Sequence, residues 1–313
     1  MPYVKGPRGG SMEEKSKAGF VFGWKVIAYL FLAGVGGGAS SVGATFHLIH
    51  PEAEKVILFG VILGAPLVFL GSLLLLIDLG RPQVAFRAFS RPNKAWISRG
   101  SIVLTTFIIL GAIQIGTWIW PFQGLKEYPS LHLILNLVNG IFGIFTIIYT
   151  AFLFDTTRSI PFWSTPILPL LFLVSGISTG IFALILSFLL SGNSSGQWIS
   201  VLGKFDAFLL LFEALIIIFY LHGMHEVTAA RASVQRVVKG DLSIPFWVGV
   251  ILIGLVIPFL IEIILGGEPF AMVLASLCGL VGGLYVRYVV VTGAVKAPLN
   301  TEGVLISLSP RPE

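Results

Sequence analysis

Charged residues are scarce in this chain. Only 11% of its 313 residues are Asp, Glu, Lys or Arg, whereas 56% are hydrophobic and the mean hydropathy is +0.94. A soluble globular domain carries about 25% charged residues, so this composition excludes an ordinary soluble fold. The long uncharged runs that result indicate a polytopic membrane protein.

Cysteine is nearly absent as well, because Cys278 is the single example. One cysteine excludes a disulfide framework and any iron–sulfur cluster held by cysteines of this chain. The sequence also lacks His and carboxylate residues at metal-ligand spacing, a phosphate-binding loop and a nucleophile elbow. We therefore expect no metal site and no iron–sulfur cluster on this chain.

Extended soluble segments are lacking too. The chain divides into an N-terminal tail (1–24), a transmembrane domain (25–295) and a C-terminal tail (296–313). The first 20 residues contain no apolar core, so we expect no cleavable signal peptide and assign insertion to the first span. Because no soluble active domain fits, we expect the protein to work with a partner.

What the chain does contain is a series of apolar runs. A helix needs about 20 such residues to cross the hydrocarbon, and the runs do not alternate as barrel strands would. The sequence predicts an all-α fold of eight transmembrane helices. They are placed at 25–48, 56–78, 97–120, 131–154, 166–190, 203–224, 245–265 and 269–292.

The basic residues are sorted by side of the membrane. We call the side that holds the N-terminus side one. Of the 20 Lys and Arg residues, 16 fall on side one, Arg287 lies inside the last span, and side two holds Lys55, Lys126 and Lys204. The positive-inside rule then places both termini in the cytoplasm. The pI of about 9.4 thus reflects membrane insertion, and no nucleic-acid partner is expected.

Ionisable residues inside spans are costly in a bilayer and therefore suggest function. Glu213 lies near the middle of the sixth span, whereas Asp206, Glu262 and Arg287 lie nearer to span ends. Two interpretations stand for Glu213: a neutral carboxylic acid bonded to a neighbouring helix, or a group that moves protons.

Two spans end on side one with an acid and a base three residues apart. These are Asp78 with Arg81, and Asp155 with Arg158. Residues at this spacing share a helix face and can pair, so each is either an ion pair that holds a loop or part of a proton route.

The first span is crowded with small residues. Gly34 and Gly38 have the GxxxG spacing that lets helices approach closely, and the same run could form a cleft for a flat ring. Tyr29 precedes it, and Tyr149 lies at a similar depth in the fourth span. Interfacial belts explain many Tyr residues, but a phenol beside such a cleft can also bind a quinone carbonyl.

Histidines allow another interpretation. His47 and His132 lie at a similar depth on side two, as the two ligands of a bis-histidine haem must. Histidines at span ends are more often interfacial. The haem-bearing, cytochrome-like subunit stays an alternative at this point.

Several phrases together resemble one family. The run Tyr29 to Gly34 looks like the first span of the NrfD-like membrane subunits, which include the polysulfide reductase membrane subunit. "DLGRP" at 78–82 is similar to the signature that ends the second span. The most specific phrase is "PFWSTPILPLLFLVSGISTG" at 161–180, and "DLSIPFWVGVILIGLVIP" at 241–258 resembles the entry to the seventh span.

This resemblance implies a quinone-binding membrane subunit of a multi-subunit oxidoreductase. Members have two four-helix bundles and generally bind no haem. The resemblance implies exchange of electrons between menaquinone or ubiquinone and an iron–sulfur partner, which often serves a molybdopterin catalytic subunit or a multihaem cytochrome. It implies a quinone site in the first bundle. The residues carried over are Tyr29, Tyr149, Gly34, Asp78 and Arg81.

The same resemblance leaves proton coupling and the docking side open. Glu213, Asp206, Asp155, Arg158 and Arg287 are the residues of a candidate proton pathway. The basic side-one loop would dock an acidic face of the partner through Arg87, Arg91 and Lys94.

Charge bias places that loop in the cytoplasm, whereas the polysulfide reductase type docks its partners on the outer face; the resemblance implies the cytoplasmic membrane of a prokaryotic cell. A proton- or ion-translocating subunit without a quinone site remains the alternative of another class.

Overall fold

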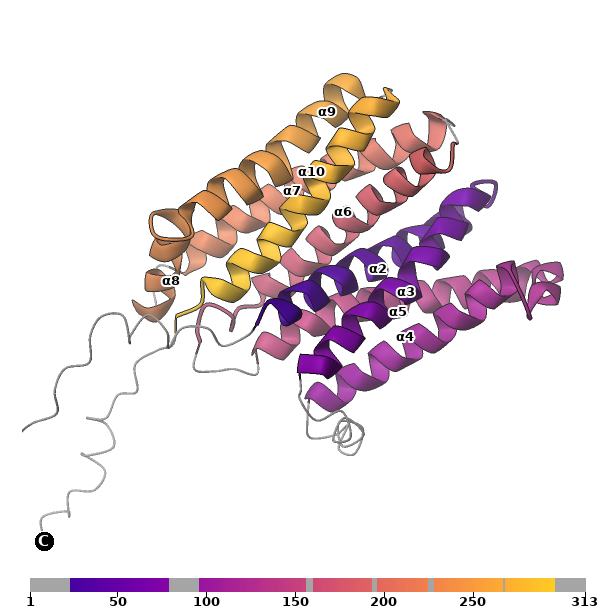
Figure 1. Ribbon diagram of the computed structural model, residues 1–313, viewed down its shortest axis with the longest axis horizontal. Coiled ribbons are helices and arrows are strands. Elements are labelled where there is room, and N and C mark those ends of the chain that lie inside the picture. Colours follow the sequence, from indigo (N-terminus) through magenta and orange to yellow (C-terminus); the bar gives the residue numbers. More distant parts are fainter. Residues whose placement is uncertain are drawn as a thin grey trace, which may run out of the picture.

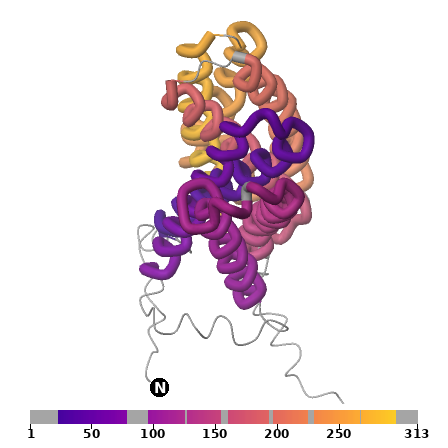
Figure 2. The backbone as a smooth tube through the Cα atoms, turned by 90° about the vertical axis from the view of Figure 1, so that its right-hand side faces the viewer, coloured from indigo at the N-terminus to yellow at the C-terminus, as the bar shows by residue number. Residues whose placement is uncertain are grey.

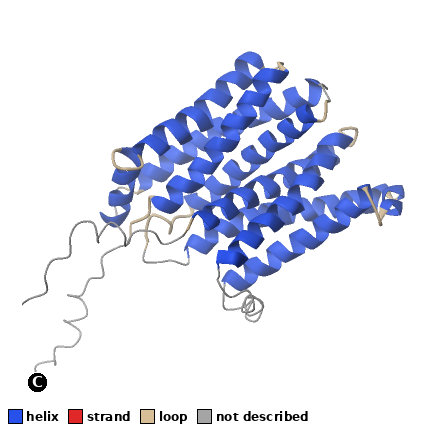
Figure 3. Ribbon diagram, in the orientation of Figure 1, coloured by secondary structure: helices blue, strands red, loops and turns tan. Residues whose placement is uncertain are grey.

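The computed structural model describes residues 23–78, 96–155, 160–192, 196–224, 228–266 and 268–295. Within these ranges the regular elements are all helices (Figure 3). They are α2 (Trp24–Ile49), α3 (Glu54–Asp78), α4 (Trp96–Trp118), the 3-10 helix η3 (Gln123–Glu127), α5 (Pro129–Asp155), α6 (Ile167–Leu190), α7 (Gly196–Gly223), α8 (Thr228–Val238), the π-helix η4 (Pro245–Val256), α9 (Ile257–Leu265) and α10 (Pro269–Thr292).

The helices form two bundles (Figure 1). In the first, α2 packs on α3 and α5, and α4 closes the bundle against both of these. In the second, α6 packs on α7 and α10, while α10 also packs on η4 and α9. The α2–α6 contact joins the two, and Figure 2 shows the orange and yellow second half beside the indigo and magenta first half. The predicted all-α architecture is confirmed.

Three faces of α2 are in close contact with other helices because its glycines leave no side chains in the way. A Cβ added at Gly36 would lie 2.7 Å from the Gly64 carbonyl oxygen of α3, and one at Gly37 equally close to the Gly143 oxygen of α5. One at Gly38 would lie only 2.0 Å from the Gly176 oxygen of α6. Small residues allow such approach in lipid, where van der Waals contact drives helix association. The glycine run therefore makes α2 the central helix of the molecule.

The count of spans differs from the prediction. Seven stretches of the described chain are long and apolar enough to cross a membrane, with η4 and α9 counting as one span, Pro245–Leu265. The protein is therefore a multi-pass membrane protein. The 28-residue α7 is not among the seven and carries Lys204, Asp206 and Glu213, so a count of eight is not confirmed.

Two further predictions met different outcomes. The segment 225–244, which lies between two predicted spans and has no predicted helix, contains the 11-residue helix α8. The predicted tails, apart from residues 23 and 24, lie outside the described residues. The first and last described helices, α2 and α10, begin and end at the same end of the bundles, which is side one (Figure 1).

Candidate functional site

Tyr29 is fully buried inside the first bundle. It follows the start of α2 by about one turn, and its ring lies over Gly71 of α3, where a Cβ would stand 3.3 Å from the Tyr29 Cδ2 atom. Its hydroxyl has no hydrogen-bond partner among the described residues. An unpaired buried hydroxyl is costly, so it marks a place where a ligand group can be accepted.

Tyr149 of α5 lies close to this phenol. Its ring fills the space over Gly100 of α4, because a Cβ there would stand 1.6 Å from the Tyr149 Cζ atom. The two phenols are near enough to interact electrostatically. The structure therefore brings together two residues that the sequence placed at a common depth, 120 positions apart in the chain.

The side-one rim above the phenols carries charge. Asp78, at the end of α3, pairs with Lys25 of α2, with 3.6 Å between the Asp78 Oδ1 and the Lys25 Nζ atoms. Nearby on α4, Trp96 stacks on Phe152 of α5 at 5.3 Å between ring centroids, and the guanidinium of Arg99 lies 4.8 Å from the Trp96 ring.

Several predicted site residues lie outside what the structure describes. For Arg81, Arg87, Arg91, Lys94 and Arg158 no position is described, and of Asp155 only the backbone is. The described partner of Asp78 is thus Lys25, and the predicted pairs of Asp78 with Arg81 and Asp155 with Arg158 stay predictions.

Gly34 lies away from the phenols. A Cβ at this position would stand 2.7 Å from the Nη2 atom of Arg287, so the missing side chain makes room for the guanidinium of α10. A quinone contact at Gly34 stays a prediction. The described role of this glycine is to let the two bundles meet around a buried cation.

A row of ionisable side chains runs through the second bundle. Asp206 and Glu213 of α7, Glu262 of α9 and Arg287 of α10 are all at most 5% exposed. Arg287 donates from Nη1 to the Ser175 Oγ atom at 2.5 Å and to the Gly283 carbonyl oxygen at 2.9 Å. The structure thus gathers the four residues that the sequence marked as costly in a bilayer.

Hydroxyl groups of α6 lie between the members of this row. The Glu213 carboxyl interacts with the Ser175 hydroxyl and with the positive charge of Arg287. The Asp206 carboxyl lies near the Ser178 hydroxyl and interacts with the Glu262 carboxyl. Beside Glu213, a small cavity lined by Ser175, Ser178 and Gly283 has room for about one water molecule. Acid groups, hydroxyls and room for water are the parts from which proton relays in membranes are built.

A second polar network was not predicted. In the first bundle, Asn136 donates to the Nδ1 atom of His47, Gln114 donates to Asn136, and Asn139 donates to both Gln114 and Ser40. These amides were detectable in the sequence as isolated polar residues within apolar spans. Their mutual hydrogen bonds lower the cost of burying them in the bilayer.

This network bears on the haem alternative. The rings of His47 and His132 do approach each other, with centroids 5.1 Å apart and planes 59° apart. However, His47 bonds to Asn136, and the ring of Trp118 packs against His132 at 5.8 Å. A bis-histidine haem needs an iron and a porphyrin plane between the imidazoles, whereas here the two rings pack directly against each other. In the described ranges, no group of three or more His, Cys, Asp or Glu residues is arranged to hold a metal ion.

The comparisons with known proteins agree with this architecture. The family description "Polysulphide reductase, NrfD" matches residues 13–297. The sequence is 29% identical to a polysulfide reductase chain of Wolinella succinogenes, over 82% of this protein and 86% of that relative.

Two further relatives are more distant or partial. The sequence is 26% identical to the NrfD homologue of Haemophilus influenzae, over 86% of this protein and 92% of that relative. It is also 28% identical to a selenate reductase subunit of Mesobacillus selenatarsenatis, over 51% of this protein and 40% of that relative. Because the family match covers the whole transmembrane domain and most of the chain, the chain belongs to the NrfD family of polysulphide reductase membrane proteins.

Proposed function

We propose that this chain is the membrane-anchor and quinone/quinol-binding subunit of a respiratory oxidoreductase complex. The observation that carries the proposal is the buried hydroxyl of Tyr29, which has no partner among the described residues and lies beside Tyr149 near side one. Relatives that are named as parts of reductases support membership of such a complex.

The residues at this site suit a quinone headgroup. A quinone, menaquinone or ubiquinone, supplies an exchange of two electrons and two protons when it is bound. The Tyr29 hydroxyl can donate to a carbonyl oxygen, and the burial of both phenols keeps water from competing for that bond. The Lys25–Asp78 pair at the rim places an ionisable acid where protons can pass between the site and the aqueous phase.

Electrons must leave through another protein. Cys278 is the one cysteine of this chain, so a cysteine-held cluster has to belong to a partner. We infer an iron–sulfur subunit that docks on side one, near the phenols, with a molybdopterin catalytic subunit or multihaem cytochrome beyond it. Arg87, Arg91 and Lys94 would attract its acidic face. The complex would sit in the cytoplasmic membrane of a prokaryotic cell.

The binding experiment compares three proteins purified with their partner subunits. Binding of a menaquinol analogue is followed by fluorescence quenching in the wild type, in Tyr29→Phe and in Tyr220→Phe. Tyr220 is an equally buried tyrosine of the second bundle, bonded to the Phe162 carbonyl oxygen, and serves as the matched control.

Loss of one hydrogen bond of about 0.5–1.5 kcal/mol weakens binding by roughly twofold to tenfold in Tyr29→Phe and leaves Tyr220→Phe unchanged. Equal affinity in all three proteins would move the site away from Tyr29. No binding by the assembled wild-type complex would refute the quinone proposal.

A second function is favoured by the buried row in the other bundle. We propose that Glu262, Asp206 and Glu213 carry protons between side two and the middle of the membrane, beside the fixed positive charge of Arg287. Asp206 and Glu213 are seven residues apart on α7, about 10 Å, and the Ser175 and Ser178 hydroxyls lie along that interval. This row would couple proton movement to electron transfer, or would serve translocation alone if the quinone proposal fails.

A further inference from the structure

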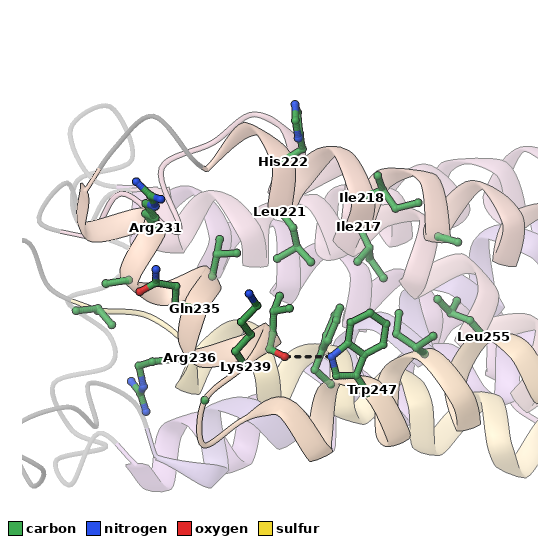
Figure 4. A pocket seen from close by; sticks show the side chains of 18 of the residues that line it. Ile217, Ile218, Leu221, His222, Arg231, Gln235, Arg236, Lys239, Trp247 and Leu255 are labelled. Atoms are coloured by element: carbon green, nitrogen blue, oxygen red, sulfur yellow. Dashed lines mark hydrogen bonds between the residues drawn. The ribbon is translucent and has the colours of Figure 1, made fainter.

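A large groove opens on the second bundle, away from the phenols and the carboxyl row. It has a volume of about 1280 Å³ and is lined by side chains of α7, α8 and η4 (Figure 4). Along α7 it extends from Ala214 to His222, about 12 Å of helix. The two helices that form its walls, α7 and η4, make few contacts with each other.

The two ends of the groove differ in chemistry. The end within the membrane-spanning helices is apolar, with Ile217, Ile218 and Leu255 on its walls (Figure 4). Ile218 is 61% exposed, and a lipid acyl chain can cover this apolar surface favourably. Near the other end, the indole of Trp247 donates to the Val238 carbonyl oxygen at 3.1 Å, in the position that Trp takes at a membrane interface.

The interfacial end carries two available cations. Arg231 and Lys239 line the groove, are exposed, and have no ion-pair partner within the described residues. Arg236 also lines it but is held by the Asp241 carboxylate, with bonds of 2.7 Å and 3.1 Å. The rim therefore offers a net positive charge directly above an apolar channel.

Helix α8 carries Arg231, and Lys239 follows directly after its last residue, so this helix places both cations at that level. Its buried positions, Ala230, Ser233, Val234 and Val237, repeat at three- and four-residue spacing and form one face. The Ser233 Oγ atom accepts a bond from the Val295 amide at 2.9 Å, which ties α8 to the segment beyond α10. An amphipathic helix held in this way lies along the interface and presents its basic residues to lipid headgroups.

From this geometry we propose that the groove is a binding site for an anionic phospholipid. One acyl chain lies between α7 and η4, and the phosphate lies between Arg231 and Lys239. Charge complementarity selects the anionic lipid over a zwitterionic one, since a phosphocholine headgroup carries no net charge for the two cations to attract.

The test measures lipid binding by native mass spectrometry on delipidated protein in detergent. Phosphatidylglycerol and phosphatidylcholine are titrated against the wild type, the double variant Arg231→Gln/Lys239→Gln, and Lys204→Gln. Lys204 is an exposed cation at the side-two end of the same helix α7 and is the matched control. We expect phosphatidylglycerol to bind the double variant about 30-fold more weakly, with phosphatidylcholine binding and the control unchanged.

A variant that fills the groove tests its apolar part. Ala214→Phe places a ring in the channel and should lower the binding of both lipids, whatever their charge. If this variant does not assemble, Ile218→Trp at the opening serves the same purpose.

Equal binding of the two lipids by the wild type, or an unchanged affinity in the double variant, would overturn the proposal. A quinone analogue that outcompetes phosphatidylglycerol and is lost in Ala214→Phe would assign the groove to quinone instead.

Discussion

Removing the hydroxyl of Tyr29 should make the ligand-free protein more stable. A buried hydroxyl without a partner costs roughly 1–3 kcal/mol, and the Tyr29 hydroxyl has none among the described residues. The substitution Tyr29→Phe keeps the ring over Gly71 and removes only the oxygen. We expect the free energy of unfolding to rise by about 1–2 kcal/mol.

The same change at Tyr220 should have the opposite sign. Its hydroxyl donates to the Phe162 carbonyl oxygen at 2.5 Å, and both groups are buried. The substitution Tyr220→Phe removes that bond and leaves the carbonyl without this donor. The expected loss is about 1–2 kcal/mol. The two variants together distinguish a hydroxyl that binds a ligand from one that stabilises the fold.

The measurement is unfolding by sodium dodecyl sulfate in mixed micelles, followed by far-ultraviolet circular dichroism on quinone-free protein. Adding a quinol analogue should then stabilise the wild type more than Tyr29→Phe, because ligand binding adds RT ln(1 + [L]/Kd) to stability. If Tyr29→Phe loses as much stability as Tyr220→Phe, the hydroxyl has a structural partner, and the reasoning that assigns it to a ligand is refuted.

Three other predictions concern packing, proton movement and pH. Gly38→Ala should lower the free energy of unfolding by about 1–3 kcal/mol, because its Cβ would stand 2.0 Å from a backbone oxygen of α6. In the same unfolding assay, the control Gly124→Ala should leave the free energy of unfolding unchanged, because a Cβ there has nothing within 4 Å. Glu213→Gln should retain quinol oxidation but lose proton transfer, measured with a pH-sensitive dye in proteoliposomes; full proton transfer in this variant would contradict the proposed row. The hydrogen bond from Arg236 holds the pKa of Asp241 in the folded protein below its ordinary value of 3.8. The pair therefore stabilises the fold above pH 3.8, and this stabilisation is lost as the pH falls through the pKa that Asp241 has in the folded protein. We expect the free energy of unfolding to fall by at most about 1 kcal/mol, because the pair is exposed. Unfolding measured between pH 5 and 2 in roughly half-unit steps should show this loss in the wild type but not in Asp241→Asn.

Much of the transmembrane domain was predictable from local patterns. A backbone in hydrocarbon must satisfy its own hydrogen bonds, so an uncharged run of about 20 residues can only be a helix. The predicted span 245–265 coincides with Pro245–Leu265, and the first differs from α2 by one residue at each end. Helix α8 was missed because only 11 residues make it up and its apolar positions are few.

The candidate site was predictable only in part. Glu213 and Arg287 were identified because an ionisable side chain in a span has to be buried among helices, and both are. Their shared partner Ser175 could not be identified in this way, because a serine in an apolar run has no distinctive signal. The amides of Asn136 and Gln114 had such a signal but were overlooked.

The amino-acid sequence by itself determined which segments are long and apolar enough to cross a membrane and which residues are too polar to face lipid, because the bilayer imposes those rules on each helix separately. Only the tertiary structure decided the partners. It placed Asp78 beside Lys25, Gly34 against Arg287 and the Tyr29 phenol near Tyr149. These pairings depend on how helices distant in sequence are rotated and packed against one another, which no local pattern encodes.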